Sequence, residues 1–257
     1  MRRIEGLLID LDGTMYEAGT PVPGAAEAVE RLRRQRLPFL FTTNTSRRCR
    51  RDIAADLRAM GLRIYETEIF SAPVAAAGWL TSVGLRRVQL LVPESTHSDF
   101  ADFTVTEQHP EAVLVGDMGA AFTFAVLNGA FRNLLAGARL VAIHRNRFWL
   151  PENEPSLDAG PFVAALEYAT GKAATLVGKP APAFFDAAAA LLGVPRECLA
   201  VVGDDIESDV KGGRAAGLAT YQVRTGKFDE AALAKAGPEE RPHGVLASIA
   251  DVSSIIA

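Results

Sequence analysis

Short apolar runs alternate with segments of helical periodicity along most of the chain. In its first part, residues 7–9 and 38–41 predict buried strands, and residues 25–36 and 47–60 predict helices. The alternation returns late in the chain. There it predicts strands at 174–177, 200–202 and 220–223 and helices at 183–192 and 209–216. This pattern is typical of an α/β fold with a doubly wound, Rossmann-like parallel sheet.

The middle of the chain has a strand and helix rhythm of its own. Apolar runs at 88–92, 113–115 and 140–143 predict strands, and 122–135 predicts a helix. We therefore expect two domains. Residues 1–75 and 173–257 form the core, and residues 76–172 form a smaller α/β domain inserted into it.

Composition narrows the class of protein. With 257 residues, 49% of them hydrophobic, the chain can bury a sizeable core, and its net charge of -4 gives no reason to expect nucleic acid as a partner. No apolar run reaches the roughly 18 residues that span a bilayer, and the first residues lack a signal-peptide layout. Two cysteines are too few for a disulfide framework. We expect a cytoplasmic protein with no membrane partner.

The first candidate site follows the strand at 7–9. Asp10 and Asp12 stand two positions apart, followed by Gly13 and Thr14. Two carboxylates this close repel each other, which favours a hard cation between them. Asp10 is a candidate nucleophile and Asp12 a candidate general acid and base. The alternative is a solvated turn, since Asp and Gly favour turns.

The second candidate site is Thr43 and Asn44, directly after the strand at 38–41. Hydroxyl and amide groups between a strand and a helix can hold phosphate oxygens, together with backbone N–H groups at the helix start. The alternative is ordinary N-capping of that helix by Thr45 or Ser46.

The third candidate site is Lys179, which follows the strand at 174–177 and precedes Pro180. Its ammonium group would offset the charge of a phosphate and a carboxylate nucleophile. The alternative is a surface lysine. The segment is not a P-loop, because the upstream glycine-rich run and the following Ser or Thr are missing.

The fourth candidate site follows the strand at 200–202. Asp204 is the best candidate for a direct metal ligand, and Asp205 and Asp209 are expected behind it, with Asp209 acting through water or orienting Lys179. The alternative is an acidic N-cap cluster in which Ser208 or Asp209 caps the next helix. Polar residues follow four predicted strands, in an order compatible with one edge of one sheet. A single catalytic site explains this better than four unrelated turns or caps.

These four motifs, in this order, resemble those of the haloacid dehalogenase superfamily of phosphohydrolases. The insertion before Lys179 resembles the large α/β cap, of C2 type, of its NagD-like branch. Segments spread over nearly the whole chain resemble the phospholysine phosphohistidine inorganic pyrophosphate phosphatase group within it. They are residues 41–44, 142–144, 160–162, 165–169 and 223–227.

The resemblance implies roles for matching positions. Asp10 would be the nucleophile and a Mg²⁺ ligand, Asp12 the acid and base that also binds Mg²⁺ through its backbone carbonyl, and Asp204 the third ligand. Thr43, Asn44 and Lys179 would hold the phosphoryl group. The dehalogenases of the superfamily lack the second aspartate, so Asp12 favours phosphoryl transfer. The resemblance also implies a homodimer formed through the cap.

The cap departs from its relatives at one loop. Many of them carry Asn-Pro-Asp where this chain has His144, Arg145 and Asn146, followed by Arg147, Phe148 and Trp149. In one interpretation this loop selects the leaving group: the arginines bind a second phosphate or carboxylate and the aromatic rings pack on an apolar part. In the other, the arginines are solvated and the rings belong to the cap core.

The sequence therefore predicts a Mg²⁺-dependent phosphatase that hydrolyses a small phosphorylated metabolite through an aspartyl-phosphate. Phosphomonoesters, pyrophosphate and phosphoramidates are all open as substrates. Two alternatives are a phosphotransferase that uses the same intermediate and a slow phosphate-binding protein. Asp12 argues against the second, because binding alone does not need an acid.

Overall fold

The computed structural model describes residues 3–149 and 154–256. The chain divides into two compact units. The core unit comprises Met1–Thr43, Arg50–Phe70 and Lys179–Ala257, and the insert unit comprises Asn44–Cys49 and Ser71–Gly178. The domain division expected at 75/76 and 172/173 lies a few residues inside these bounds, and it did not include the short segment at 44–49.

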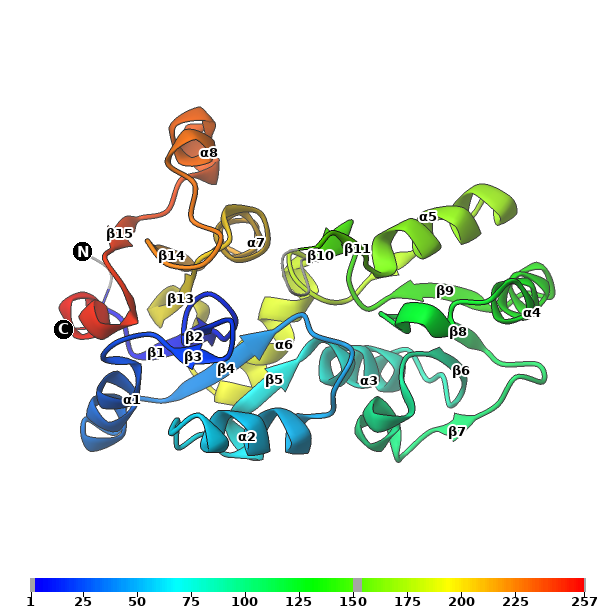
Figure 1. Cartoon of the computed structure of the whole chain (residues 1–257), viewed down its shortest axis with the longest axis horizontal. Helices are drawn as coiled ribbons and strands as arrows, with labels where there is room; N and C mark the ends of the chain where they lie inside the picture. Colours follow the sequence, from blue (N-terminus) through cyan, green and yellow to red (C-terminus); the bar gives the residue numbers. More distant parts are fainter. Residues whose placement is uncertain (1–2, 150–153, 257) are drawn as a thin grey trace. The chain divides into compact units, whose positions relative to one another are not determined.

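A six-stranded sheet forms the centre of the core unit (Figure 1). Its order is β15-β14-β13-β1-β4-β5, and β1 pairs in parallel with both β4 and β13. The apolar run in β1 is buried on both faces, as expected for an inner strand of a parallel sheet. The strands are β1 (Gly6–Asp10), β4 (Phe39–Thr43), β5 (Ile69–Ser71), β13 (Leu199–Gly203), β14 (Ala219–Val223) and β15 (Gly244–Leu246).

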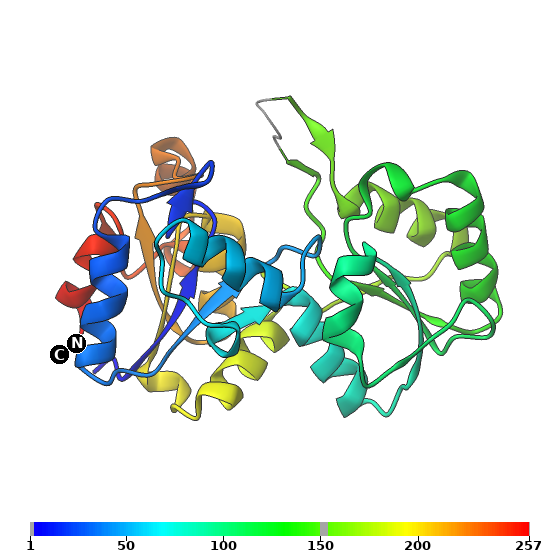
Figure 2. The ribbon, with the colours of Figure 1, turned by 60° about the horizontal axis from the view of Figure 1, so that its bottom comes forward.

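Helices cover both faces of this sheet, which confirms the predicted doubly wound α/β fold (Figure 2). Leu7 and Ile9 of β1 pack with apolar side chains of α1 and α2. Side chains alternate along a strand, so Val201 of β13 points to the other face of the sheet. There Gly213 of α7 lies against it. The helices are α1 (Ala25–Arg34), α2 (Arg50–Ala59), α6 (Pro182–Leu192), α7 (Gly212–Ala215) and α8 (Glu230–Lys235).

Shorter elements complete the core unit. The helix predicted at 209–216 is a π-helical turn followed by the short α7. Both parts are helical, so the predicted helical segment is confirmed, and only the π geometry of its first part was not expected. These elements are the antiparallel hairpin β2 (Tyr16–Glu17) and β3 (Thr20–Pro21), the 3₁₀ turns η1 (Glu66–Glu68), η5 (Arg196–Cys198), η7 (Pro238–Glu240) and η8 (Ile249–Ile255), and the π-helical η6 (Ile206–Lys211).

The insert unit has a parallel sheet of its own, in the order β12-β9-β8-β6-β7. Apolar side chains of α4 and α5 pack on one face of it, and α3 lies on the other (Figures 1 and 2). Its elements are α3 (Ala72–Ser82), β6 (Arg87–Leu91), η2 (Glu94–Phe100), β7 (Thr104–Val105), β8 (Ala112–Val115), η3 (Gly119–Ala121), α4 (Phe124–Leu135), β9 (Arg139–Ala142), β10 (Phe148–Trp149), β11 (Ser156–Leu157), α5 (Ala159–Thr170) and β12 (Thr175–Leu176).

One strand joins a different sheet from the one expected. The run at 174–177 was predicted as a strand of the core, but β12 pairs with β9 of the insert unit, Thr175 opposite Val141. A short apolar run predicts a buried, extended segment, and it carries no information about which of two sheets supplies the partner strand.

None of the helices in the described part of the chain is long and apolar enough to cross a membrane.

Candidate active site

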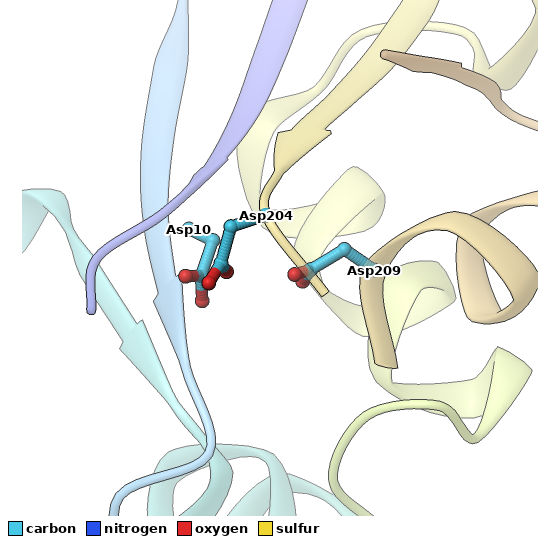
Figure 3. Close-up of side chains that lie close together, drawn as sticks. All are labelled: Asp10, Asp204 and Asp209. Atoms are coloured by element: carbon cyan, nitrogen blue, oxygen red, sulfur yellow. The ribbon is translucent and has the colours of Figure 1, made fainter. Parts of the chain in front are cut away.

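Three buried aspartates meet at the carboxyl ends of neighbouring core strands (Figure 3). Asp10 ends β1, Asp204 directly follows β13, and Asp209 projects toward them from η6. One carboxylate oxygen from each lies within 4.8 Å of the others. Such a set of hard oxygen ligands suits a divalent cation such as Mg²⁺. The sheet brings together Asp10 and Asp204, as the sequence predicted.

Lys179 lies inside this acidic cluster and is only 3% exposed, so the alternative of a surface lysine is wrong. Its Nζ donates to Asp10 Oδ1 at 2.5 Å and to Asp209 Oδ1 at 2.6 Å. Burial alone would lower the pKa of Lys179, but the charges of Asp10 and Asp209 outweigh it and raise the pKa. The lysine is therefore a buried cation, and Asp209 holds it in place.

The cluster holds more negative charge than Lys179 balances. Burial, together with the charges of Asp10 and Asp209, raises the pKa of Asp204 to about 8. A carboxyl group held this far from its ordinary value indicates that the site lacks positive charge. A divalent cation would supply it.

Asp12 lies just outside the cluster, in the loop after β1, where the residue is partly in contact with solvent and partly enclosed by protein. Desolvation and the nearby charge of Asp10 raise the pKa of Asp12. A carboxyl group that keeps its proton more readily is suited to protonate a leaving group.

Asp205 and Asp209 play different parts, since Asp209 belongs to the cluster and Asp205 does not. Asp205 caps η6 by accepting from the N–H groups of Glu207 at 2.8 Å and Ser208 at 3.2 Å. The alternative interpretation, in which Ser208 or Asp209 caps this turn, is wrong, because Asp205 supplies the cap and Asp209 points into the site.

The two residues of the predicted phosphate-binding pair fall on opposite sides of a unit boundary. Thr43 is the last residue of β4 and is 6% exposed, and Asn44 is the first residue assigned to the insert unit. The alternative that Thr45 or Ser46 caps the following helix is wrong, since α2 begins only at Arg50.

The predicted cap residues lie in the insert unit. His144 is 2% exposed, and its Nε2 is hydrogen-bonded to Ser46 Oγ at 2.9 Å. Arg145 makes a bidentate ion pair with Glu167, with N–O distances of 2.9 and 2.5 Å. The Asn146 carbonyl accepts a hydrogen bond from the Gly160 N–H. These contacts fix the loop within the insert unit, and its part in substrate selection stays a prediction.

The aromatic residues of that loop do not belong to the cap core. Phe148 is 54% exposed and Trp149 36%, because β10 pairs with β11 in a two-stranded sheet that is separate from the five-stranded sheet. Trp149 instead lies under the guanidinium group of Arg47, 4.4 Å from the ring centre. Arg145, Arg147 and Phe148 line an open pocket of about 510 Å³ at this hairpin.

The structure adds contacts that the motifs did not indicate. Gln222 of β14 donates to the Asp204 carbonyl at 2.9 Å, and Lys227 pairs with Asp205 at 3.3 Å. A glutamine at a buried position of β14 was the available signal for the first. Lys227 belongs to the segment at 223–227, for which the resemblance implies no role.

The fold and the site thus define an α/β enzyme with an acidic active site at its strand ends. Two family models match the chain. A haloacid dehalogenase-like hydrolase model matches residues 7–105, and a related hydrolase-like model matches residues 176–252.

Curated relatives match nearly the whole chain. Haloacid dehalogenase-like hydrolase domain-containing protein 2 of Bos taurus is 38% identical over 250 residues, covering 95% of each chain. Phospholysine phosphohistidine inorganic pyrophosphate phosphatase of Homo sapiens is 36% identical over 231 residues, covering 88% of this chain and 84% of that protein.

Solved structures share the whole fold. A 4-nitrophenylphosphatase from Thermotoga maritima superimposes with a TM-score of 0.90 at 30% identity, covering 98% of this chain and 97% of that one. A glycerol phosphate phosphatase from Mycobacterium tuberculosis, in complex with magnesium, gives 0.88 at 29% identity, covering 99% and 77%. NagD from E. coli shares the fold, with a TM-score of 0.89 at 24% identity, covering 97% and 98%.

The chain belongs to the haloacid dehalogenase-like hydrolase family and is an enzyme of the phosphatase type.

Proposed function

We propose that the protein is a Mg²⁺-dependent phosphatase that hydrolyses a small phosphorylated metabolite through an aspartyl-phosphate on Asp10. The observation that carries the proposal is the buried cluster of Asp10, Asp204 and Asp209 around Lys179. A nucleophile, a cation site and a fixed ammonium group then meet at one edge of one sheet.

The metal would be held by the carboxylates of Asp10 and Asp204 and by the backbone carbonyl of Asp12. The oxygen-only donor set and the raised pKa of Asp204 support this assignment. When bound, Mg²⁺ supplies positive charge that lets an anionic phosphate approach Asp10. We assign to Asp209 the role of holding Lys179, since its Oδ1 accepts from Lys179 Nζ at 2.6 Å.

The protein residues then carry two chemical steps. In the first, an Asp10 carboxylate oxygen attacks phosphorus, the bond from phosphorus to the leaving oxygen breaks, and Asp12 gives its proton to that oxygen. In the second, Asp12 takes a proton from water as the water oxygen attacks phosphorus, which releases phosphate and restores Asp10. Lys179 stabilises the charge on the phosphoryl oxygens in both steps.

The substrate class follows from the relatives and not from the site. Their names cover phospholysine, phosphohistidine, pyrophosphate, 4-nitrophenyl phosphate and glycerol phosphate. We assign a phosphomonoester as the substrate class, with pyrophosphate and phosphoramidates as the other candidates for a metabolite panel.

The direct test measures phosphate release from 4-nitrophenyl phosphate, with Mg²⁺ or with chelator. We expect Mg²⁺-dependent release in the wild type and its loss by at least about 1,000-fold in Asp10→Asn, which keeps the fold but removes the nucleophile. The matched control is Asp102→Asn, the same change at an exposed position of the insert unit. Substantial release by Asp10→Asn would remove Asp10 as the nucleophile.

A second assay separates hydrolysis from the two rival functions. Added alcohol acceptors divert the phosphoryl group into a new ester if the protein is a phosphotransferase. A binding protein would instead show Mg²⁺ binding without release from any member of a metabolite panel.

A further inference from the structure

Three consecutive residues after β14 each form a hydrogen bond to a different part of the candidate active site. The Thr225 hydroxyl donates to the Gly13 carbonyl at 2.5 Å. The Gly226 N–H donates to the Glu17 carboxylate. The Lys227 N–H donates to Asp204 Oδ2 at 2.7 Å. We call these three residues the 225–227 segment.

The segment touches the loop after β1 backbone to backbone. Gly13 and Gly226 both have positive φ, at 84° and 62°. A Cβ atom at either position would overlap Asp204 Oδ2, so the two glycine backbones enclose this oxygen. The Asp204 carboxylate therefore lies between two loops that leave no room for another side chain.

Holding Oδ2 fixes the orientation of the whole carboxylate group. Lys227 N–H binds one oxygen of Asp204, and the Gln222 side chain binds its main-chain carbonyl at 2.9 Å. A ligand held in this way loses little conformational entropy when a metal binds to it.

The segment also fixes the backbone beside Asp12. Gly13, whose carbonyl accepts from Thr225, donates its own N–H to the Tyr16 carbonyl at 2.8 Å, and Glu17 is the next residue of the hairpin β2-β3. The loop that carries Asp12 is thus attached to the 225–227 segment at two points.

We propose that the 225–227 segment is a positioning element that orients Asp204 and the Asp12 loop for metal binding. The inference rests on the proposed function, because it takes Asp204 as a metal ligand. The residues act through Asp204 and Gly13 and do not themselves contact the reacting atoms.

The test uses Thr225→Val, which keeps the shape of the side chain and removes its hydroxyl donor. One readout is the rise in thermal midpoint as Mg²⁺ is titrated into protein stripped with chelator, which needs no turnover. The other is the Mg²⁺ concentration that gives half-maximal hydrolysis of 4-nitrophenyl phosphate, with kcat and KM.

We expect Thr225→Val to raise the Mg²⁺ requirement in both readouts by roughly 10- to 100-fold, the usual range for groups that orient a ligand. Thr225→Ser, which restores the hydroxyl, should return both values to near wild type. Thr67→Val, at an exposed threonine of η1 in the same unit, is the matched control and should change neither.

Glu17→Ala provides a second route if Thr225→Val does not fold. It removes the acceptor of the Gly226 N–H on the exposed hairpin and should raise the Mg²⁺ requirement in the same direction. Asp204→Asn serves as the reference for loss of the ligand itself and should abolish the Mg²⁺-dependent rise in midpoint.

The outcomes distinguish this inference from the proposed function. If the foldable variants lose stability in chelator but keep the wild-type Mg²⁺ requirement, the segment is only structural and the inference is overturned alone. If wild-type protein shows no Mg²⁺ response in either readout, the metal assignment fails and the inference fails with it.

Discussion

Lys179 decides the charge balance of the candidate site at the scale of single residues. It is 3% exposed and stands between two buried carboxylates, those of Asp10 and Asp209. Removing one partner of a buried ion pair leaves an uncompensated charge, whereas removing both partners costs much less. The stabilising and the catalytic effects of this lysine can therefore be separated by mutation.

We predict that Lys179→Met lowers the free energy of unfolding by about 3–5 kcal/mol. Adding Asp209→Asn should recover part of that loss, because one of the two unpaired charges disappears. Phosphatase activity should stay absent in both variants, since the phosphoryl group loses its ammonium partner. Urea denaturation and phosphate release measure the two effects, and a double variant no more stable than Lys179→Met would contradict the assigned pairing.

The residues of the site differ in how far the sequence predicts them. Asp10 and Asp204 follow strands of one parallel sheet, and the carboxyl ends of such strands meet at one edge, so their proximity was predictable. Lys179 follows β12, which belongs to the sheet of the insert unit, so the strand pattern did not predict its place beside them. The positions of Thr225 and Glu17 were not predictable, because each side chain bonds to a backbone group, and such contacts produce no motif of spaced side chains in the sequence. The need for glycine at position 226 becomes clear only in the structure, where its backbone lies close to that of Gly13.

At the scale of elements, α5 illustrates a helix whose start depends on one side chain. Asp158 is 6% exposed and accepts from the Ala159 N–H at 2.7 Å at the first turn. The carboxylate also lies 3.6 Å from His144 Nε2, so it connects the helix to the loop before β10. The beginning of α5 and the conformation of that loop are thus linked.

We predict that Asp158→Ala destabilises the insert unit by about 1–2 kcal/mol, the typical cost of losing an N-cap. Asp158→Asn, which keeps an oxygen acceptor, should cost less. Urea denaturation followed by circular dichroism measures both. Equal losses in the two variants would show that the carboxylate charge, rather than the cap, stabilises this region.

The elements that the sequence misjudged share a physical cause. The run at 174–177 was correctly predicted to be extended, but tertiary packing determines which strand β12 pairs with. Phe148 and Trp149 were placed in the cap core in one interpretation, yet they lie on the two-stranded hairpin β10-β11, outside the five-stranded sheet, and are 54% and 36% exposed. Periodicity predicts local conformation and does not specify which layer an element packs against.

At the scale of the whole molecule, each unit has a hydrophobic core of its own. Leu57 of α2 is buried in the core unit and Leu134 of α4 in the insert unit. The chain passes between the units at 43/44, 49/50, 70/71 and 178/179. Separate cores favour separate unfolding transitions, even in a chain that crosses between them this often.

We predict two calorimetric transitions, only one of which rises in temperature when Mg²⁺ is added. Leu57→Ala should lower the Mg²⁺-responsive transition and Leu134→Ala the other, each by the equivalent of about 2–5 kcal/mol. The reason is that the proposed metal ligands all belong to the core unit. A single transition lowered by both substitutions would show that the units unfold as one.

The strand order of the core sheet has a consequence for biosynthesis. β1 lies between β4 and β13, and Gly6 pairs with Leu199, so β1 cannot complete its pairing until β13 has been translated. At about 5–20 residues per second, the ribosome needs roughly 10–40 s to cover this interval. Throughout it, one edge of an apolar strand is open to the wrong partners. The insert unit, complete at Gly178, therefore has all its residues before the core sheet can close.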